Sequence, residues 1–124
     1  MLYSLDSETY IDYIPHKHEY RTWINRLTEK EIEAIHEKLN QMIEGDEIHT
    51  SSWLPGSDWS GTAFHPIFET ACRYNEDAAG MCFGLMLWHV LKDRADVWGF
   101  GRYEKNGIPI QGMTYFKINN PPTK

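Results

Sequence analysis

The run from Ala78 to Leu91 constrains the fold more than any other part of the chain, because it is fourteen residues of uncharged and almost wholly apolar sequence. A helix that crosses a bilayer needs about 20 such residues, so the run is too short for a membrane span. Asn75 and the two acidic residues after it form a typical helix start. The sequence therefore predicts a central buried helix over residues 76–93, with His89 as a hydrogen-bonded core residue.

The segment from Val97 to Ile118 predicts a β-hairpin with Asn106-Gly107 as a two-residue type I′ turn. Such a turn pairs Trp98 with Tyr115, Phe100 with Met113, and Gly101 with Gly112. Because side chains alternate along a strand, the aromatic face holds Trp98, Phe100, Arg102, Met113 and Tyr115.

The opposite face of this hairpin contains three glycines, at positions 99, 101 and 112, between Val97 and Phe116. Glycines in strands indicate that something packs closely against the backbone. Two occupants are consistent with the sequence: the central helix, through Gly80 and Gly84, or a ligand or partner.

Three further helices are predicted before the central one. Residues 16–27 carry apolar side chains at i, i+3, i+4 and i+7 from Tyr20. Thr28-Glu29-Lys30-Glu31 is a capping box that begins the next helix, and Gly45 marks its end. Pro66 fits the first turn of a short helix over residues 66–74.

Residues 48–53 predict a short strand beside the two strands of the hairpin. Residues 1–15 are consistent with a short helix over 7–14 or with an extended arm. A length of 124 residues fits one domain. We therefore expect a single α+β domain over residues 1–124, with a small antiparallel sheet of about three strands packed on about four helices.

The charge balance and the two cysteines restrict the partners and the compartment. The formal net charge is −6, and no run of Lys or Arg forms the basic surface that nucleic acid requires. The first residues lack the basic and apolar regions of a secretory signal. We therefore expect a cytoplasmic protein with free thiols at Cys72 and Cys82 and no nucleic-acid or membrane partner.

The loop from Trp53 to Thr62 is the first candidate site, because its Pro, Gly and Ser residues surround two tryptophans and an acid. Trp53 and Trp59, with the Asp58 carboxylate, are suited to a cationic or flat ligand or to a partner. The structural alternative is that both rings fill the core while Asp58 accepts hydrogen bonds from nearby amides. The two interpretations differ in whether the rings are exposed.

The aromatic face of the hairpin is the second candidate site, with Trp98, Arg102 and Tyr115 as its binding residues. An arginine side chain in the middle of a strand on an aromatic face needs a carboxylate partner or an aromatic ring to stack on. A structural ion pair is thus the alternative role for Arg102. The carboxylates available for such a pair are Asp58, Asp96 and Glu104.

Catalytic and metal chemistry have less support in the sequence. Neither cysteine and no serine lies in a known nucleophile motif. His16 and His18 are the only close histidine pair and have no third ligand nearby, so neither a metal nor a cofactor is predicted. The enzymatic alternative is a small hydrolase with Asp58, His65 and Arg102 around a loop-lined pocket.

The sequence thus favours a non-catalytic binding or regulatory protein. It would hold a protein partner or a small ligand through the aromatic loop 53–62 and the aromatic hairpin face. An aromatic content of 14%, the small size and the lack of a catalytic motif favour this interpretation over the hydrolase. A homodimer through the aromatic hairpin face is a third interpretation.

Overall fold

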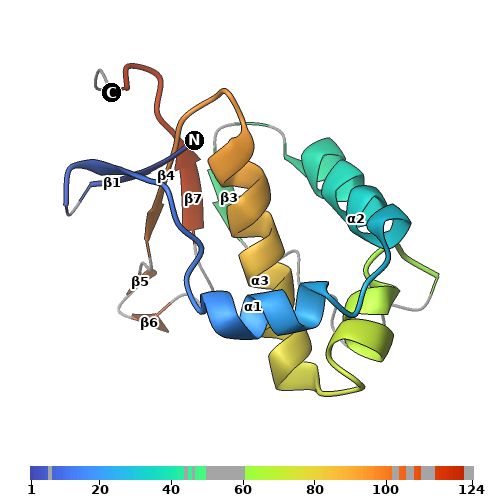
Figure 1. Cartoon of the computed structure of the whole chain (residues 1–124). Helices are drawn as coiled ribbons and strands as arrows, with labels where there is room; N and C mark the ends of the chain where they lie inside the picture. The colour runs from blue at the N-terminus through green and yellow to red at the C-terminus, as the bar shows by residue number, and fades with distance from the viewer. Residues whose placement is uncertain are drawn as a thin grey trace. The chain divides into compact units, whose positions relative to one another are not determined.

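The chain divides into two compact units in the computed structural model (Figure 1). Unit 1 comprises Met1–Tyr13, Ile43–Leu54 and Leu91–Lys124, and unit 2 comprises Ile14–Met42 and Pro55–Val90. The structure describes residues 1–5, 7–43, 45, 47–49, 61–101, 104–105, 108–109 and 114–121, of which 47–49, 104–105 and 108–109 are described by their backbone.

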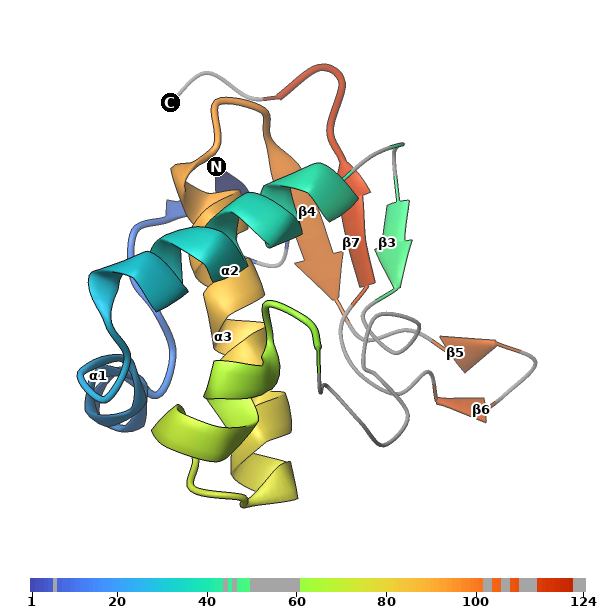
Figure 2. The ribbon, with the colours of Figure 1, turned by 90° about the vertical axis from the view of Figure 1, so that its right-hand side faces the viewer.

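Unit 1 contains a five-stranded sheet in the order β2-β1-β4-β7-β3. Its strands are β1 (Leu2–Ser4), β2 (Thr9–Ile11), β3 (Glu47–His49), β4 (Trp98–Gly101) and β7 (Thr114–Lys117). Figure 2 shows β4, β7 and β3 side by side. β1 pairs with β4 in parallel, and the other pairs are antiparallel.

The predicted α+β class and the C-terminal hairpin are confirmed. The sheet is mixed and larger than expected, because residues 1–15 form β1 and β2 rather than a helix. Each of these strands has three residues, which is too short for an alternating apolar pattern to be recognised. β1 is nevertheless central to unit 1, and Leu2 is fully buried.

The hairpin has two registers. Lys105 in β5 (Glu104–Lys105) pairs with Ile108 in β6 (Ile108–Pro109), which agrees with the predicted two-residue connection. In β4 and β7, however, Gly101 pairs with Thr114 and Phe100 with Tyr115. The predicted pairing is wrong by two residues there, because Gly101 and Glu104 are three residues apart and Pro109 and Thr114 are five apart. A shift of two keeps the described residues Trp98, Phe100 and Tyr115 on one face of the hairpin, as predicted.

The close packing expected at the glycines is found at Gly99, and its cause is internal to the hairpin. A Cβ at Gly99 would lie 2.3 Å from Cε2 of Phe116, the residue that pairs with it across the strands. At Gly80 and Gly84 no described heavy atom lies within 4 Å of such a Cβ. The glycine at position 99 therefore makes room for a neighbouring ring.

Unit 2 contains the helices α1 (Lys17–Ile24) and α2 (Glu29–Met42), the π-helix η2 (Ile67–Ala71) and most of α3 (Glu76–Asp93). The capping box is confirmed: the Thr28 amide donates to Glu31 Oε1 at 2.9 Å, and the Glu31 amide donates to Thr28 Oγ1 at 3.1 Å. Gly45, beyond the end of α2, has the positive φ of 75° that its position requires.

Helix α3 has the predicted bounds, and the Ala78 amide donates to Asn75 Oδ1 at 3.0 Å, so Asn75 is the N-cap. Most apolar side chains of α3 are buried, although Met81 is 46% exposed. Among the described residues, no helix combines the length and the apolar character needed to cross a membrane.

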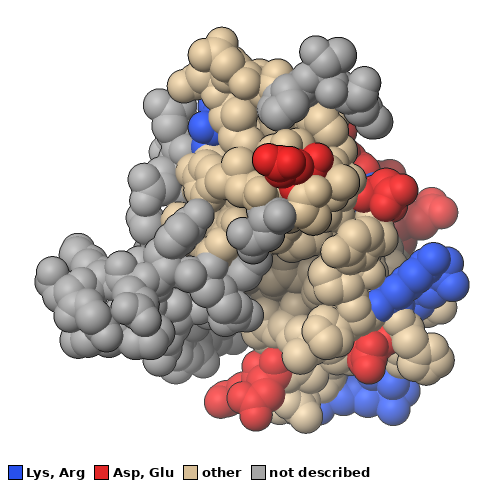
Figure 3. All heavy atoms as spheres, turned by 90° about the vertical axis from the view of Figure 1, so that its left-hand side faces the viewer, with Lys and Arg blue, Asp and Glu red and all other residues tan. Residues whose placement is uncertain are grey.

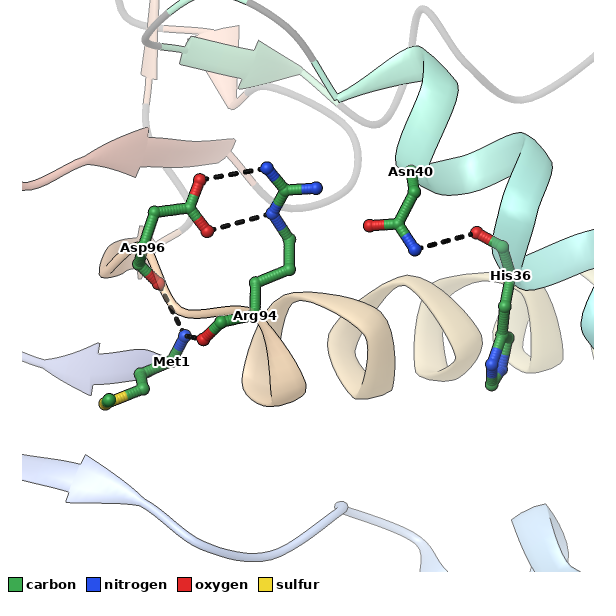
Figure 4. Close-up of polar contacts among 5 residues, drawn as sticks. All are labelled: Met1, His36, Asn40, Arg94 and Asp96. Carbon is green, nitrogen blue, oxygen red and sulfur yellow. Dashed lines mark hydrogen bonds and ion pairs between the residues drawn. The ribbon is translucent and has the colours of Figure 1, made fainter.

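The chain that follows α3 is fixed by an ion pair in unit 1. Arg94 donates from Nε and Nη2 to the two carboxylate oxygens of Asp96, at 2.9 and 3.0 Å (Figure 4). These hydrogen bonds hold the pKa of Asp96 below its usual value. The amino group of Met1 donates to the backbone carbonyls of the same two residues. Asp96, one of the carboxylates considered for Arg102, is therefore already bound by Arg94.

Candidate functional site

Four predicted site residues, Trp53, Asp58, Trp59 and Arg102, lie outside the described residues. The aromatic loop 53–62 therefore stays a prediction, as does the ion pair of Arg102.

Two described residues of the aromatic hairpin face are buried. Trp98 is 1% exposed and Tyr115 is 2% exposed, so both rings are core residues. The prediction that these two residues contact a ligand or partner requires exposed rings, and their burial does not favour it. Trp98 lies on β4, which has a strand on each side in the sheet. The sequence did not reveal this central position because β1 was not recognised as a strand.

His65, the predicted acid or base of the hydrolase alternative, pairs with a glutamate. Its Nε2 lies 2.6 Å from Oε2 of Glu69, one helical turn further along the chain. This i, i+4 pair is partly exposed, as is usual for a helix surface. Of the three residues proposed for the hydrolase, His65 alone is described, so the hydrolase alternative stays a prediction.

The connection between η2 and α3, residues 72–75, contains two successive residues with positive φ. We call it the η2–α3 junction. Arg73 and Tyr74 have φ values of 49° and 66°, a left-handed conformation that residues with a Cβ rarely adopt. Hydrogen bonds hold this backbone: the Tyr74 amide donates to the Phe68 carbonyl at 2.8 Å, and the Asn75 amide donates to the Cys72 carbonyl at 3.0 Å. The conformation is therefore built into the helix ending.

The side chain of Tyr74 is 65% exposed, more than any other large apolar side chain among the described residues. Its ring meets the Phe68 ring edge to face, with 5.3 Å between the ring centroids. Arg73 beside it is also exposed. The junction thus presents an arginine and a tyrosine to solvent from a constrained backbone.

One thiol, that of Cys72, belongs to this junction, and a second, that of Cys82, belongs to α3. Cys72 is 4% exposed and Cys82, on α3, is fully buried; both are free, as predicted. A hydrogen bond from the Cys82 thiol lowers the pKa of Cys72, burial acts in the opposite direction, and the positive charge of Arg26 lowers the pKa further. The same hydrogen bond, with burial, raises the pKa of Cys82.

Arg26 is held next to this pair by the backbone. Its Nη1 donates to the carbonyl of Ala71, the residue before Cys72, at 2.8 Å. This arrangement has no local signal in the sequence, because Arg26 follows α1 whereas the cysteines lie ten residues apart on other elements.

A second polar cluster of unit 2 joins α1, α2 and α3. The Tyr20 hydroxyl and His89 Nδ1 are 3.0 Å apart and hydrogen-bonded, as expected, although His89 is half-buried rather than a core residue. The His36 ring meets the His89 ring edge to face, with 5.2 Å between centroids. The backbone carbonyl of His36 accepts a hydrogen bond from Asn40 Nδ2 at 3.1 Å (Figure 4). Tyr20 is buried, so this cluster ties three helices together.

The charges of the described residues do not indicate a particular ionic ligand. On the face drawn in Figure 3, acidic and basic side chains are interspersed. In the described part of the chain, no three His, Cys, Asp or Glu side chains are grouped as a metal site needs. The η2–α3 junction and the thiols of Cys72 and Cys82 are therefore the strongest candidate site among the described residues.

No family model matches the sequence. Neither a curated protein nor a solved structure is significantly similar to it.

Proposed function

We propose that this is a non-catalytic binding or regulatory protein that holds a protein partner, with Arg73 and Tyr74 of the η2–α3 junction as contact residues. The observation that carries the proposal is the 65% exposure of Tyr74 on a left-handed backbone. The aromatic loop 53–62 is the second proposed contact, and it rests on the sequence.

The junction retains two residues that are unfavourable for folding. A left-handed residue with a Cβ costs about 1–3 kcal/mol, and glycine would recover only part of that cost because it loses more backbone entropy on folding. Helices commonly end on a glycine in this conformation, as α2 does near Gly45. The presence of Arg73 and Tyr74 where glycine would be more stable supports a role for their side chains.

The nature of these side chains favours a protein partner over a small ligand. Small ligands are held in concave pockets that bury most of their surface. Tyrosine and arginine are enriched among the residues that dominate the energy of protein–protein interfaces. An exposed tyrosine beside an exposed arginine is suited to entering a pocket of a partner.

Photo-crosslinking tests the proposal. Benzoylphenylalanine is placed at position 74 and, as a matched control, at Tyr13, which is 56% exposed and belongs to unit 1. In the cells that make the protein, position 74 should give an adduct of one reproducible mass that position 13 does not give. Trp53→Ala and Trp59→Ala should each reduce its yield. The same adducts from both positions, or none from position 74, would contradict the proposal.

A further inference from the structure

We propose that the partner protein presents a carboxylate, from an aspartate or a glutamate, to the guanidinium of Arg73. This inference rests on the proposed function, because it names the chemistry that the partner brings to the same contact residues. It requires that the charge of Arg73 is left uncompensated in the folded chain and that the surroundings of the η2–α3 junction accept a single negative charge.

Arg73 has no carboxylate partner within the part of the chain that the structure describes. Its side chain is exposed, and none of the ion pairs between described residues includes it. Glu76 and Asp77 follow within four residues and are exposed as well, yet neither is paired with Arg73. The guanidinium therefore keeps its fork of N–H donors for a group outside the described chain.

Arg94 shows the arrangement of an arginine that serves the fold. It donates to both carboxylate oxygens of Asp96, at 2.9 and 3.0 Å. The chain has 18 acidic and 12 basic residues, so acids are not scarce. Arg73 instead occupies a left-handed position that disfavours a side chain, and it gains no ion pair there. This contrast favours a role for its charge in binding.

Arg26 adds a second positive charge close to the same backbone. Its Nη1 donates to the carbonyl of Ala71, two residues before Arg73, at 2.8 Å. That carbonyl is a neutral acceptor, and Arg26 has no carboxylate partner among the described residues either. Two uncompensated arginines, from different parts of unit 2, therefore favour a negative group of the partner over a positive one.

A single carboxylate fits these surroundings better than a densely charged partner. Carboxylates accept bidentate hydrogen bonds from arginine, which gives both strength and orientation. Glu76 and Asp77 next to the junction, with the formal net charge of −6, repel nucleic acid or a phosphorylated segment. An isolated aspartate or glutamate pairs with Arg73 while keeping that repulsion small.

Zero-length cross-linking tests for the carboxylate directly. A carbodiimide joins an amine to a carboxylate in contact with it, and it does not couple a guanidinium. The variant Arg73→Lys therefore places a reactive amine where the guanidinium was. In a lysate of the cells that make the variant, we expect a link from position 73 to an aspartate or glutamate of the partner captured by photo-crosslinking at position 74. Arg21→Lys makes the same change at an exposed residue of α1, and it should give no link from position 21.

A charge series provides a second readout that does not depend on carbodiimide chemistry. With benzoylphenylalanine at position 74, Arg73→Glu should lower the yield of the photo-adduct by about ten-fold or more, because like charges would then meet. Arg73→Lys should retain most of the yield. Both variants keep a Cβ at the left-handed position, so their melting temperatures should agree, and a difference in yield then reports on charge.

The outcomes separate this inference from the proposed function. No photo-adduct from position 74 in the unaltered chain would overturn both. A photo-adduct with no link from position 73 to a carboxylate, or with equal yields in Arg73→Glu and Arg73→Lys, would overturn the inference alone. Loss of the photo-adduct after phosphatase treatment of the lysate would also overturn it, since the partner's anion would then be a phosphate.

Discussion

Helix α2 begins at a boundary that follows the local rules of helix capping, whereas the η2–α3 junction breaks them at two successive residues. At the start of α2, Thr28 and Glu31 satisfy each other's backbone amides through their side chains. At the junction, Asn75 caps α3 in the usual way, but Arg73 and Tyr74 take a conformation that suits glycine.

We interpret the start of α2 as a boundary built for stability and the η2–α3 junction as one built for function. A sequence selected for folding alone agrees with local preferences at every level, and departures from them tend to mark functional sites. The boundary at Thr28 is explained by its hydrogen bonds. At the junction, hydrogen bonds hold the backbone but do not explain why Arg73 and Tyr74 rather than glycine occupy it. Their exposed side chains contribute little packing, and a binding role accounts for their presence.

The largest effect is expected at the regular boundary. Thr28→Ala removes the hydroxyl that accepts a hydrogen bond from the Glu31 amide. This change should lower the free energy of unfolding by about 1 kcal/mol. Denaturant unfolding measures this loss. Glu31→Gln is the control, because glutamine can still reach back to the Thr28 amide. An unchanged stability in Thr28→Ala would mean that the capping box does not stabilise α2.

A smaller effect of opposite sign is expected at the junction. Arg73→Gly relieves a left-handed backbone, and we expect it to raise the free energy of unfolding by up to about 1 kcal/mol. Thermal unfolding should then shift upward by about 2–8 °C. The control is Arg21→Gly, which places glycine within α1 and should lower stability by about 1 kcal/mol. A loss of stability in both variants would show that the junction is not strained.

The smallest effect on stability is expected where we place the binding contact. Tyr74→Ala removes an exposed ring whose described ring partner is Phe68, and it should change the free energy of unfolding by less than about 0.5 kcal/mol. The same variant should lose most of its partner binding. A large drop in melting temperature would instead make Tyr74 a structural residue.

The aromatic loop makes a parallel case. Trp53→Ala and Trp59→Ala should weaken partner binding with nearly unchanged melting temperatures, because exposed rings add little to folding. If both variants melt far below the wild type, the two rings belong to the core and the loop is not a contact surface.

The features that the sequence predicted are those encoded by neighbouring residues. The capping box at Thr28, the N-cap at Asn75 and the glycine at position 45 each depend on a few consecutive positions. The bounds of α3 followed from its apolar run. Such signals are local, so they can be found without knowing the rest of the fold.

The features that it did not predict depend on residues far apart in the chain. β1 has three residues and pairs with the equally short β2 and with β4, which lies almost a hundred residues later. Tyr20 and His89 meet across 69 residues. Trp98 and Tyr115 are likewise buried in the folded chain, which the alternation of residues along the hairpin did not indicate.

The most direct test of the junction's role uses an Arg73→Gly variant that also carries benzoylphenylalanine at position 74. Its unfolding temperature and its yield of cross-linked adduct are measured together. The side chains of Arg73 and Tyr74 are proposed to be kept for binding at the expense of folding. We therefore predict that this variant unfolds at a higher temperature than its Arg73 counterpart and gives a lower yield of the cross-linked adduct. A higher unfolding temperature with an undiminished yield would contradict the role of Arg73 in the contact, and a lower temperature would contradict the strain.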